Sequence, residues 1–111
     1  MIAELVTFQN PEGASREALL DGARTTLPRW QANDQLLRKH YLCSLDRSRG
    51  MGFYLWTSIE AARAGHDAEW IAEAEARTGG KIHIEYHDLL MVLDNEAGTV
   101  TAYPEPPGET P

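Results

Sequence analysis

The chain has 111 residues, of which 42% are hydrophobic, and this is enough for the core of one small domain but too little for two. Ten Lys and Arg residues against seventeen Asp and Glu residues give a net charge of −7. No basic cluster could track a phosphate backbone, so we expect no nucleic acid partner. No apolar run approaches the roughly 20 residues that span a bilayer, so we expect no membrane association.

The cysteine content favours a cytoplasmic location. Cys43 is the single cysteine and cannot form a disulfide within the chain, and the first residues, MIAELVTFQ, lack the basic start and long apolar run of a signal peptide. Cys43 itself lies in an apolar stretch, which is typical of a small core residue rather than a nucleophile.

The first predicted elements are a strand and a helix. Residues 2–8 are rich in strand formers and end before Asn10-Pro11-Glu12-Gly13, which has the composition of a turn. Ser15 is a good N-cap, and Leu and Ala residues then recur at helical spacing. Pro28 is expected to end or bend this helix.

A hairpin and a second helix follow. Residues 36–45 and 51–56 are extended on either side of a polar turn and predict a β-hairpin. The sequence Thr57-Ser58-Ile59-Glu60 has the spacing of a capping box with Thr57 as the cap. A second helix is therefore predicted to begin directly after the hairpin.

The second helix is predicted to be broken. Gly65 lowers helix propensity in its middle, and Asp67 is a good cap for a renewed segment. The segment 78–80, Thr-Gly-Gly, is expected to end it. His66 should therefore lie at the break.

The last predicted elements are a long strand, residues 81–93, and a proline-rich flexible tail, residues 98–111. Residues 1–97 then form one domain with the order βαββαβ. This is the α+β ferredoxin-like arrangement, a four-stranded antiparallel sheet with two helices on one face.

Both faces of this sheet are predicted to carry apolar side chains. In the last strand Ile84, Tyr86 and Val92 alternate with Leu89 and Met91. A sheet with one face in water alternates more cleanly. Because the chain has no further element to cover the second face, we expect the same sheet of a second copy to cover it, in a homodimer.

Three features carry a resemblance to a known family: the stretch Gly52-Phe53-Tyr54-Leu55-Trp56-Thr57, the Ala-rich helix directly after it, and the long closing strand. Over roughly residues 1–95 the chain resembles the YdhR-like mono-oxygenases of the dimeric α+β barrel superfamily, which is also that of the antibiotic biosynthesis monooxygenases. The resemblance implies a dimeric α+β barrel with a cavity in each subunit between sheet and helices.

The resemblance also implies a set of activities. The superfamily includes cofactor-independent oxygenases of phenolic or polyketide substrates, small cyclases and isomerases, and haem-degrading enzymes. Haem-degrading members depend on a histidine late in the second helix, and residues 71–77 contain none. We therefore expect a mono-oxygenase without a cofactor, acting on a small aromatic or polyketide-like substrate. A cyclase or isomerase of this fold, and a non-catalytic protein that binds a small hydrophobic ligand, remain alternatives.

The third strand supplies candidate pocket residues. Alternation places Gly52, Tyr54 and Trp56 on one face. Large aromatic rings fill cores as often as they line pockets, so core filling is one interpretation and a pocket wall is the other. Gly52 favours the pocket, because a missing side chain beside two rings leaves space that a helix or a ligand must fill.

His66 is the candidate general base. Residues at a helix break often line an opening, and an imidazole exchanges protons near neutral pH. A lone histidine beside Asp67 is also compatible with a solvated surface residue. At such a break His66→Ala should cost little stability. The predicted catalytic residues are His66 and Tyr54, and the predicted substrate-binding residues are Trp56, Trp70, His40 and Trp30.

No metal is expected. His83, Glu85 and His87 share one face of the last strand. A strand rises about 3.3 Å per residue, so the two histidines are about 13 Å apart and cannot both bind one ion at about 2 Å. A His–Glu pair alone is an incomplete site.

Overall fold

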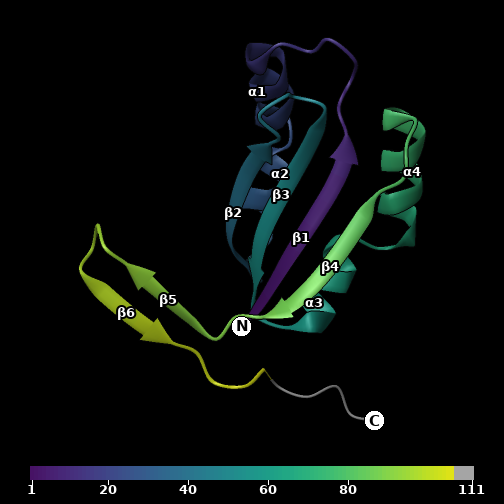
Figure 1. Cartoon of the computed structure of the whole chain (residues 1–111). Helices are drawn as coiled ribbons and strands as arrows, with labels where there is room; N and C mark the ends of the chain where they lie inside the picture. Colours follow the sequence, from purple (N-terminus) through teal and green to yellow (C-terminus); the bar gives the residue numbers. More distant parts are fainter. Residues whose placement is uncertain (107–111) are drawn as a thin grey trace.

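The structure is a computed structural model and describes residues 1–106. Its elements in chain order are β1 Ile2–Gln9, α1 Arg16–Arg24, α2 Leu27–Gln31, β2 Leu36–Cys43, β3 Arg49–Trp56, α3 Ile59–Gly65, α4 Ala68–Thr78, β4 His83–Asp88, β5 Met91–Asp94 and β6 Thr99–Ala102. Figure 1 shows the helices behind one sheet and β5–β6 as an arm that leaves the sheet near the N-terminus.

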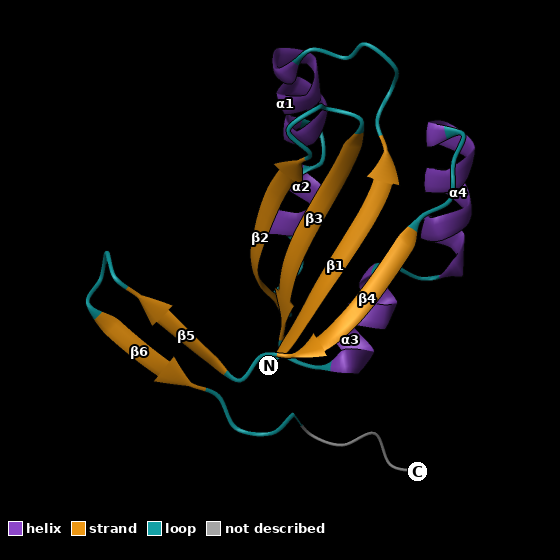
Figure 2. Ribbon diagram, viewed as in Figure 1, coloured by secondary structure: helices purple, strands orange, loops and turns teal. Residues whose placement is uncertain are grey.

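The sheet has the strand order β2-β3-β1-β4, and each neighbouring pair is antiparallel. The predicted α+β ferredoxin-like architecture is therefore confirmed. Each of the two predicted helices is divided into two, α1 with α2 and α3 with α4. β5 and β6 form a separate two-stranded sheet (Figure 2).

The strand register places four functional side chains in one row across the sheet. Lys39 on β2 lies opposite Tyr54 on β3, Tyr54 lies opposite Glu4 on β1, and Glu4 lies opposite Tyr86 on β4. Side chains alternate between faces along a strand. These four residues therefore share the face that carries the core, and the site is built on the two central strands.

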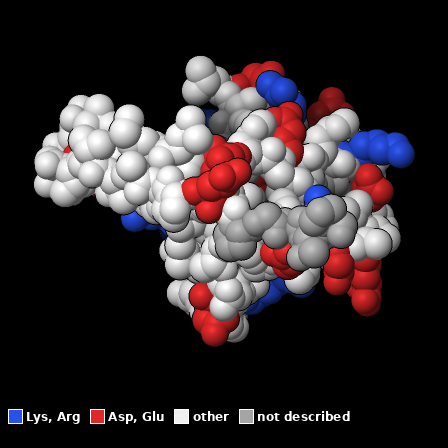
Figure 3. Space-filling model, turned by 90° about the horizontal axis from the view of Figure 1, so that it is seen from below, with Lys and Arg blue, Asp and Glu red and all other residues white. Residues whose placement is uncertain are grey.

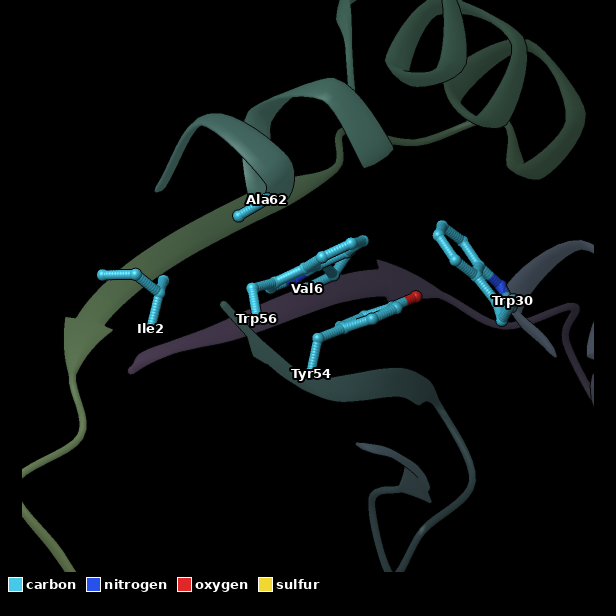
Figure 4. Packing of buried hydrophobic residues seen from close by; sticks show 6 residues of the cluster. All are labelled: Ile2, Val6, Trp30, Tyr54, Trp56 and Ala62. Carbon is cyan, nitrogen blue, oxygen red and sulfur yellow. The ribbon is translucent and has the colours of Figure 1, made fainter. Parts of the chain in front are cut away.

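The core lies between this face and the helices. Val6, Trp56 and Ala62 are fully buried, and Trp30 of α2 packs with them (Figure 4). α3 approaches the sheet closely at Gly65, where an added Cβ would lie 2.5 Å from the Trp56 ring. The glycine is therefore required by its close packing against Trp56.

Two helix signals act differently from the prediction. Pro28 lies in the first turn of α2 and begins that helix rather than ending α1, because a proline at this position loses no helical hydrogen bond. Ser58, not Thr57, caps α3, and its side chain accepts from the Ala61 backbone N–H at 3.1 Å. The Thr57 hydroxyl instead bonds the Gln35 side chain at 2.6 Å.

The predicted helix break is confirmed. α3 ends at Gly65, His66 follows as its C-cap, and Asp67 caps α4 by accepting from the Trp70 backbone N–H at 2.8 Å. Gly79 ends α4 with φ 75°, a left-handed conformation that suits glycine. The break leaves the His66 side chain pointing into the core rather than along a helix surface.

β2 contains a register shift that changes its inward face. Leu36 pairs with Trp56 but Arg38 pairs with Leu55, so Leu37 is the extra residue. Such a bulge reverses the alternation on one strand relative to its partner. As a result Leu36 packs against the same core as Tyr54, which lies opposite Lys39.

The closing strand is shorter than predicted. β4 ends at Asp88, and the Leu89 N–H bonds the Met1 carbonyl at 2.9 Å before the chain turns into the β5–β6 arm. Residues 99–102, predicted to belong to the tail, form β6 instead. The last five residues of the predicted tail, 107–111, lie outside the described residues.

The arm and the sheet face away from the helices expose apolar side chains. On the arm these are Leu90, Met91, Leu93 and Val100, and on β2 they are Leu37 and Leu42. Figure 3 shows the arm almost free of charged side chains on the face in view. Within residues 1–106, no helix is long and apolar enough to cross a membrane.

Candidate functional site

A buried carboxylate and a buried imidazole meet at the centre of the core face. Glu4 lies on the central strand β1, and its Oε1 is 2.9 Å from Nδ1 of His66. The same oxygen accepts a hydrogen bond from the Trp56 indole N–H at 2.8 Å. Both side chains of the Glu4–His66 pair are fully buried, so the helix break positions the imidazole directly over the sheet.

Both ring nitrogens of His66 lack a hydrogen-bond partner in the described part of the chain. The Glu4 carboxylate also interacts with the Tyr86 hydroxyl, and a hydrogen bond between the two contributes to the raised pKa of Tyr86. Nδ1 is close to Oε1, but the contact is too poorly aligned to be a hydrogen bond. Because unpaired buried polar atoms cost free energy and are rare, this pair is the candidate centre of the site.

Four aromatic rings surround His66. The ring centroids lie 4.4 Å away for Trp70, 4.6 Å for Tyr54, 5.0 Å for Trp30 and 6.2 Å for Trp56. They come from α4, β3 and α2, so three separate segments enclose one imidazole. The chain has three tryptophans, and all of them belong to this cluster.

Two basic side chains lie beside the same cluster. The Lys39 Nζ is 4.7 Å from the Tyr54 ring centroid, 4.8 Å from that of Trp30 and 3.9 Å from that of Tyr41. The Arg29 guanidinium lies 4.9 Å from the Trp30 centroid. The pKa of Lys39 is lowered to about 7, first by burial and then by the charge of Arg29, while Glu4 acts in the opposite direction.

The tyrosines in the row keep their protons. Burial raises the pKa of Tyr54 well above its usual value, and the Glu4 carboxylate raises it further. Burial, followed by Glu4, raises the pKa of Tyr86 to about 12. A phenol of this kind donates hydrogen bonds but does not abstract protons near neutral pH. If Tyr54 acts in catalysis, it acts as a donor rather than as the base.

Most of the predicted site residues come together, and one does not. His66, Tyr54, Trp56, Trp70 and Trp30 form the cluster around the imidazole. His40 lies on the opposite face of the sheet, where it packs on Phe53 with ring centroids 5.8 Å apart. Alternation along β2 explains this, because Lys39 faces the core and its neighbour must therefore face away.

His66 is not a surface residue, and Gly52 leaves no empty space. His66 is only 3% exposed, because the helix break turns it inward. The Tyr54 ring folds over Gly52, so that an added Cβ would lie 2.6 Å from it. The space predicted beside the glycine is therefore filled by the neighbouring ring.

The outer face of the sheet contributes a separate hollow of about 520 Å³ between β2, β3 and the arm, lined by His40, Phe53, Leu55 and Leu93 among others. On the same face the His87 Nε2 lies 3.2 Å from Glu85 Oε2, and both are exposed. Within residues 1–106 no three potential metal ligands come close enough to hold an ion.

Three residues of the site were missed by sequence reasoning: Glu4, Lys39 and Arg29. Glu4 carried a usable signal, because it stands between Ile2 and Val6 on the inward alternation of a central strand. A charged residue at such a position is rarely buried without a partner. Lys39 carried no such signal, since the bulge at Leu37 is not visible in the sequence pattern.

Comparison with known proteins shows similarity in structure. The sequence matches no protein-family model and no curated protein. ActVA-Orf6, a monooxygenase of Streptomyces coelicolor solved with the ligand nanaomycin D, is 20% identical, with a TM-score of 0.64 over 83% of this chain and 89% of its own. SnoaB, a cofactor-independent oxygenase of Streptomyces nogalater, is 13% identical, with a TM-score of 0.60 over 83% and 95%. NE2512 of Nitrosomonas europaea, a protein of unknown function, is 19% identical, with a TM-score of 0.64 over 83% and 91%.

These similarities define the class of fold. The chain has a fold similar to that of solved monooxygenases of this kind, so the expected fold class is confirmed. The superfamily and the YdhR-like family within it stay predictions. At identities of 20% and below the fold alone is shared, and the activity must be argued from the site.

Proposed function

We propose that the protein is a cofactor-independent mono-oxygenase of a small aromatic or polyketide-like substrate, with His66 as the general base. The observation that carries this proposal is the buried Glu4–His66 pair enclosed by aromatic rings. The carboxylate beside Nδ1 stabilises the imidazolium that forms when Nε2 accepts a proton. The names of ActVA-Orf6 and SnoaB support the reaction class.

The base has a free nitrogen available for the substrate. Nε2 of His66 has no hydrogen-bond partner within residues 1–106. It lies among apolar ring faces, which suit a planar substrate and exclude water from a reactive anion. The Trp56 indole N–H bonds Glu4 and so keeps the carboxylate oriented towards the imidazole.

A substrate must displace one ring, because the cluster is closed. We assign this role to Trp30, which is buried and lies on α2, a helix of five residues without a side-chain cap. So short a helix has little stability of its own. The other rings are anchored on β3 or on the capped helix α4, so movement of α2 is the least costly route to His66.

The proposed reaction starts with proton transfer. His66 Nε2 removes a proton from an activated methylene of a phenolic substrate, and the conjugated anion reacts with O₂ to give a peroxide. Breaking the O–O bond with loss of water leaves a ketone. The balance is R₂CH₂ + O₂ → R₂C=O + H₂O, so one oxygen atom enters the product, the other leaves as water, and the substrate supplies all the electrons.

We propose a homodimer as the functional form. The exposed Leu90, Met91 and Leu93 of the arm and Leu42 of β2 would otherwise stay in contact with water. A second copy covers them by packing its own sheet and arm against this face. Contacts of this kind also hold β3, and with it Tyr54 and Trp56, from the opposite side of the sheet.

The test combines oxygen uptake with product analysis. Polyhydroxylated naphthalenes and anthrones are offered to the wild type, His66→Gln and His83→Ala under ¹⁸O₂. We expect one ¹⁸O atom per product molecule, and a fall in kcat/KM of about 10² to 10⁴ for His66→Gln. His83 is exposed on β4, so its variant should retain activity and serves as the matched control.

The same assay separates the alternatives. Product that forms equally well under nitrogen indicates a cyclase or isomerase, which begins with the same proton transfer. Quenching of tryptophan fluorescence without turnover indicates a binding protein, and the quenching is informative because all three tryptophans surround His66. Full activity of correctly folded His66→Gln would contradict the proposed base.

A further inference from the structure

We propose that Lys39 and Arg29 form an anion-binding subsite that holds the acidic oxygen of an aromatic substrate while His66 acts on its ring. This inference rests on the proposed function and names the substrate class: a planar aromatic compound that carries a phenolate, enolate or carboxylate. It assigns the two basic residues to binding and stabilising the anion, and leaves the proton transfer to His66.

The geometry places the amine and the base around the same two rings. Trp30 and Tyr54 each contact the His66 ring, with centroids 5.0 and 4.6 Å away. They also lie 4.8 and 4.7 Å from Lys39 Nζ. A substrate ring in the position of Trp30 therefore lies beside both the His66 imidazole and the Lys39 ammonium.

The two basic groups have no counter-ion within residues 1–106. Lys39 makes ring contacts but no hydrogen bond or ion pair, and Arg29 donates only to the Gly65 carbonyl at 3.2 Å. Glu4 is the carboxylate that faces them, and its Oε1 is committed to His66 and Trp56. Lys39 and Arg29 thus lie beside the same cluster, and neither is directly paired with a carboxylate in the described part of the chain.

The Lys39 ammonium beside Arg29 is destabilised until an anion binds. Burial and the charge of Arg29 destabilise the Lys39 ammonium and lower its pKa to about 7. The other titratable groups facing it are Tyr41 and Tyr54 of the sheet, Glu4 and His66. An anionic oxygen at Nζ favours the ammonium form and should be held by a charge-assisted hydrogen bond. By linkage, binding must then raise the pKa of Lys39.

The ring walls favour an aromatic anion over a small inorganic one. With Trp30 displaced, Tyr41 and Tyr54 still present ring faces to Nζ, which a planar substrate can stack against while its oxygen meets the amine. Phosphate or sulfate prefers several converging donors such as a backbone nest. An aromatic anion also becomes more acidic at the carbon that His66 deprotonates when its charge is stabilised at the oxygen.

Paired probes of the same shape test the subsite. The binding of 2-naphthoate, an anion, and 2-naphthamide, which is neutral, is measured by tryptophan fluorescence at pH 7. We expect the wild type to bind the naphthoate at least about tenfold tighter, and Lys39→Met to lose this preference. The chain contains one other lysine, Lys81, which is exposed, so Lys81→Met is the matched control and should keep it.

Chemical labelling gives a second, independent measurement. With Lys39 and Lys81 as the two lysines, acetic anhydride at pH 7 should acylate Lys39 at least about tenfold faster, because far more of it is uncharged. Saturating 2-naphthoate should suppress labelling of Lys39 by a similar factor and leave Lys81 unchanged. The neutral naphthamide should protect Lys39 less.

The outcomes are decisive and separate this inference from the proposed function. Equal affinity for the two probes, a preference that survives in folded Lys39→Met, or no binding of either probe below millimolar concentration would each overturn the subsite. A Lys39-dependent preference in a protein that never consumes oxygen keeps the subsite and rejects the mono-oxygenase. Oxygen consumption without any anion preference keeps the mono-oxygenase and rejects the subsite.

Discussion

Glu4 has the most unusual surroundings of the residues in this site. Its carboxylate is fully buried on the central strand, it accepts from Trp56, and it lies against His66. A buried charge is tolerated when it is paired and is expensive when its partner is removed. The stability of the core and the proposed chemistry of the site therefore depend on the same pair.

Loss of His66 should accordingly destabilise the fold. Sequence reasoning expects His66→Ala to cost little, but the imidazole is buried against four rings and a carboxylate. We expect a loss of about 2 to 4 kcal/mol in the free energy of unfolding, measured by urea denaturation. Adding Glu4→Gln to His66→Ala should recover part of it, since the unpaired charge is then gone. A loss of less than about 0.5 kcal/mol would contradict this account of the pair.

Lys39 should make stability depend on pH. Its pKa is about 7 in the folded protein against 10.5 as the ordinary value, so between these pH values the unfolded chain binds more protons. The cost of the partly buried ammonium is fully present below pH 7 and is relieved as the pH rises towards 10.5. Without this cost at low pH, Lys39→Met should be more stable than the wild type there. The difference in free energy of unfolding between the two proteins should shrink by about 1 to 2 kcal/mol from pH 6 to 9.5, a figure reduced for solvent screening.

This pH effect is checked by urea titrations of both proteins at each pH. Other titrating groups are common to the two proteins and largely cancel in the difference. Lys81→Met, at an exposed position, should show no comparable trend. A stability difference that is flat across this range, or that grows with pH, would show that Lys39 is not held in the environment described.

At the scale of elements, the broken helix α3–α4 brings the base to the sheet. α3 ends where Gly65 touches Trp56, and Asp67 then starts α4. An unbroken helix would carry position 66 round its own axis and leave the imidazole away from Glu4. The glycine and the cap therefore position the site.

Substitution of two helical glycines tests this role. Gly65→Ala puts a methyl group 2.5 Å from the buried Trp56 ring, and we expect it to lower the free energy of unfolding by about 1 to 3 kcal/mol. Gly22→Ala in α1, where nothing lies within 4 Å of an added Cβ, should instead stabilise by about 0.4 to 1 kcal/mol. Equal effects on thermal unfolding at the two positions would show that close packing at Gly65 is not the cause.

At the scale of the whole molecule, the arm is the feature that one chain leaves unexplained. Leu90 is 72% exposed and Leu93 is 64% exposed, and Figure 2 shows the arm directed away from the four-stranded sheet. A two-stranded hairpin alone is marginally stable in water. In the proposed homodimer a second copy covers the arm and the outer sheet face and so provides the missing contacts.

We therefore expect sedimentation to show a dimer at micromolar concentration, with about 2,000 Å² of total surface buried. Leu93→Glu on the arm should shift the protein to monomer, because it places a charge in an apolar interface. Ala72→Glu is the matched control, since Ala72 is exposed on α4 in the helical layer. A wild type that sediments as a monomer would overturn the dimer.

Local sequence signals determined much of the secondary structure of this protein. Strand formers, caps and turns predicted the order of the main elements, the helix break at His66, and the inward alternation of Tyr54 and Trp56. These signals act over a few residues, through backbone conformation and short hydrogen bonds, so they can be read without the fold. They also sufficed to predict that aromatic side chains and one histidine would face the helices together.

The tertiary structure alone decided which distant residues meet. Pairing of β1 with β3 brings Glu4 to Trp56 and His66, the bulge at Leu37 turns Lys39 inward, and the outward alternation of β2 takes His40 away from the site. The end of β4 at Asp88 sends the last strands into the arm. Register, bulges and strand ends depend on packing summed over the whole core, and no short stretch of sequence contains that sum.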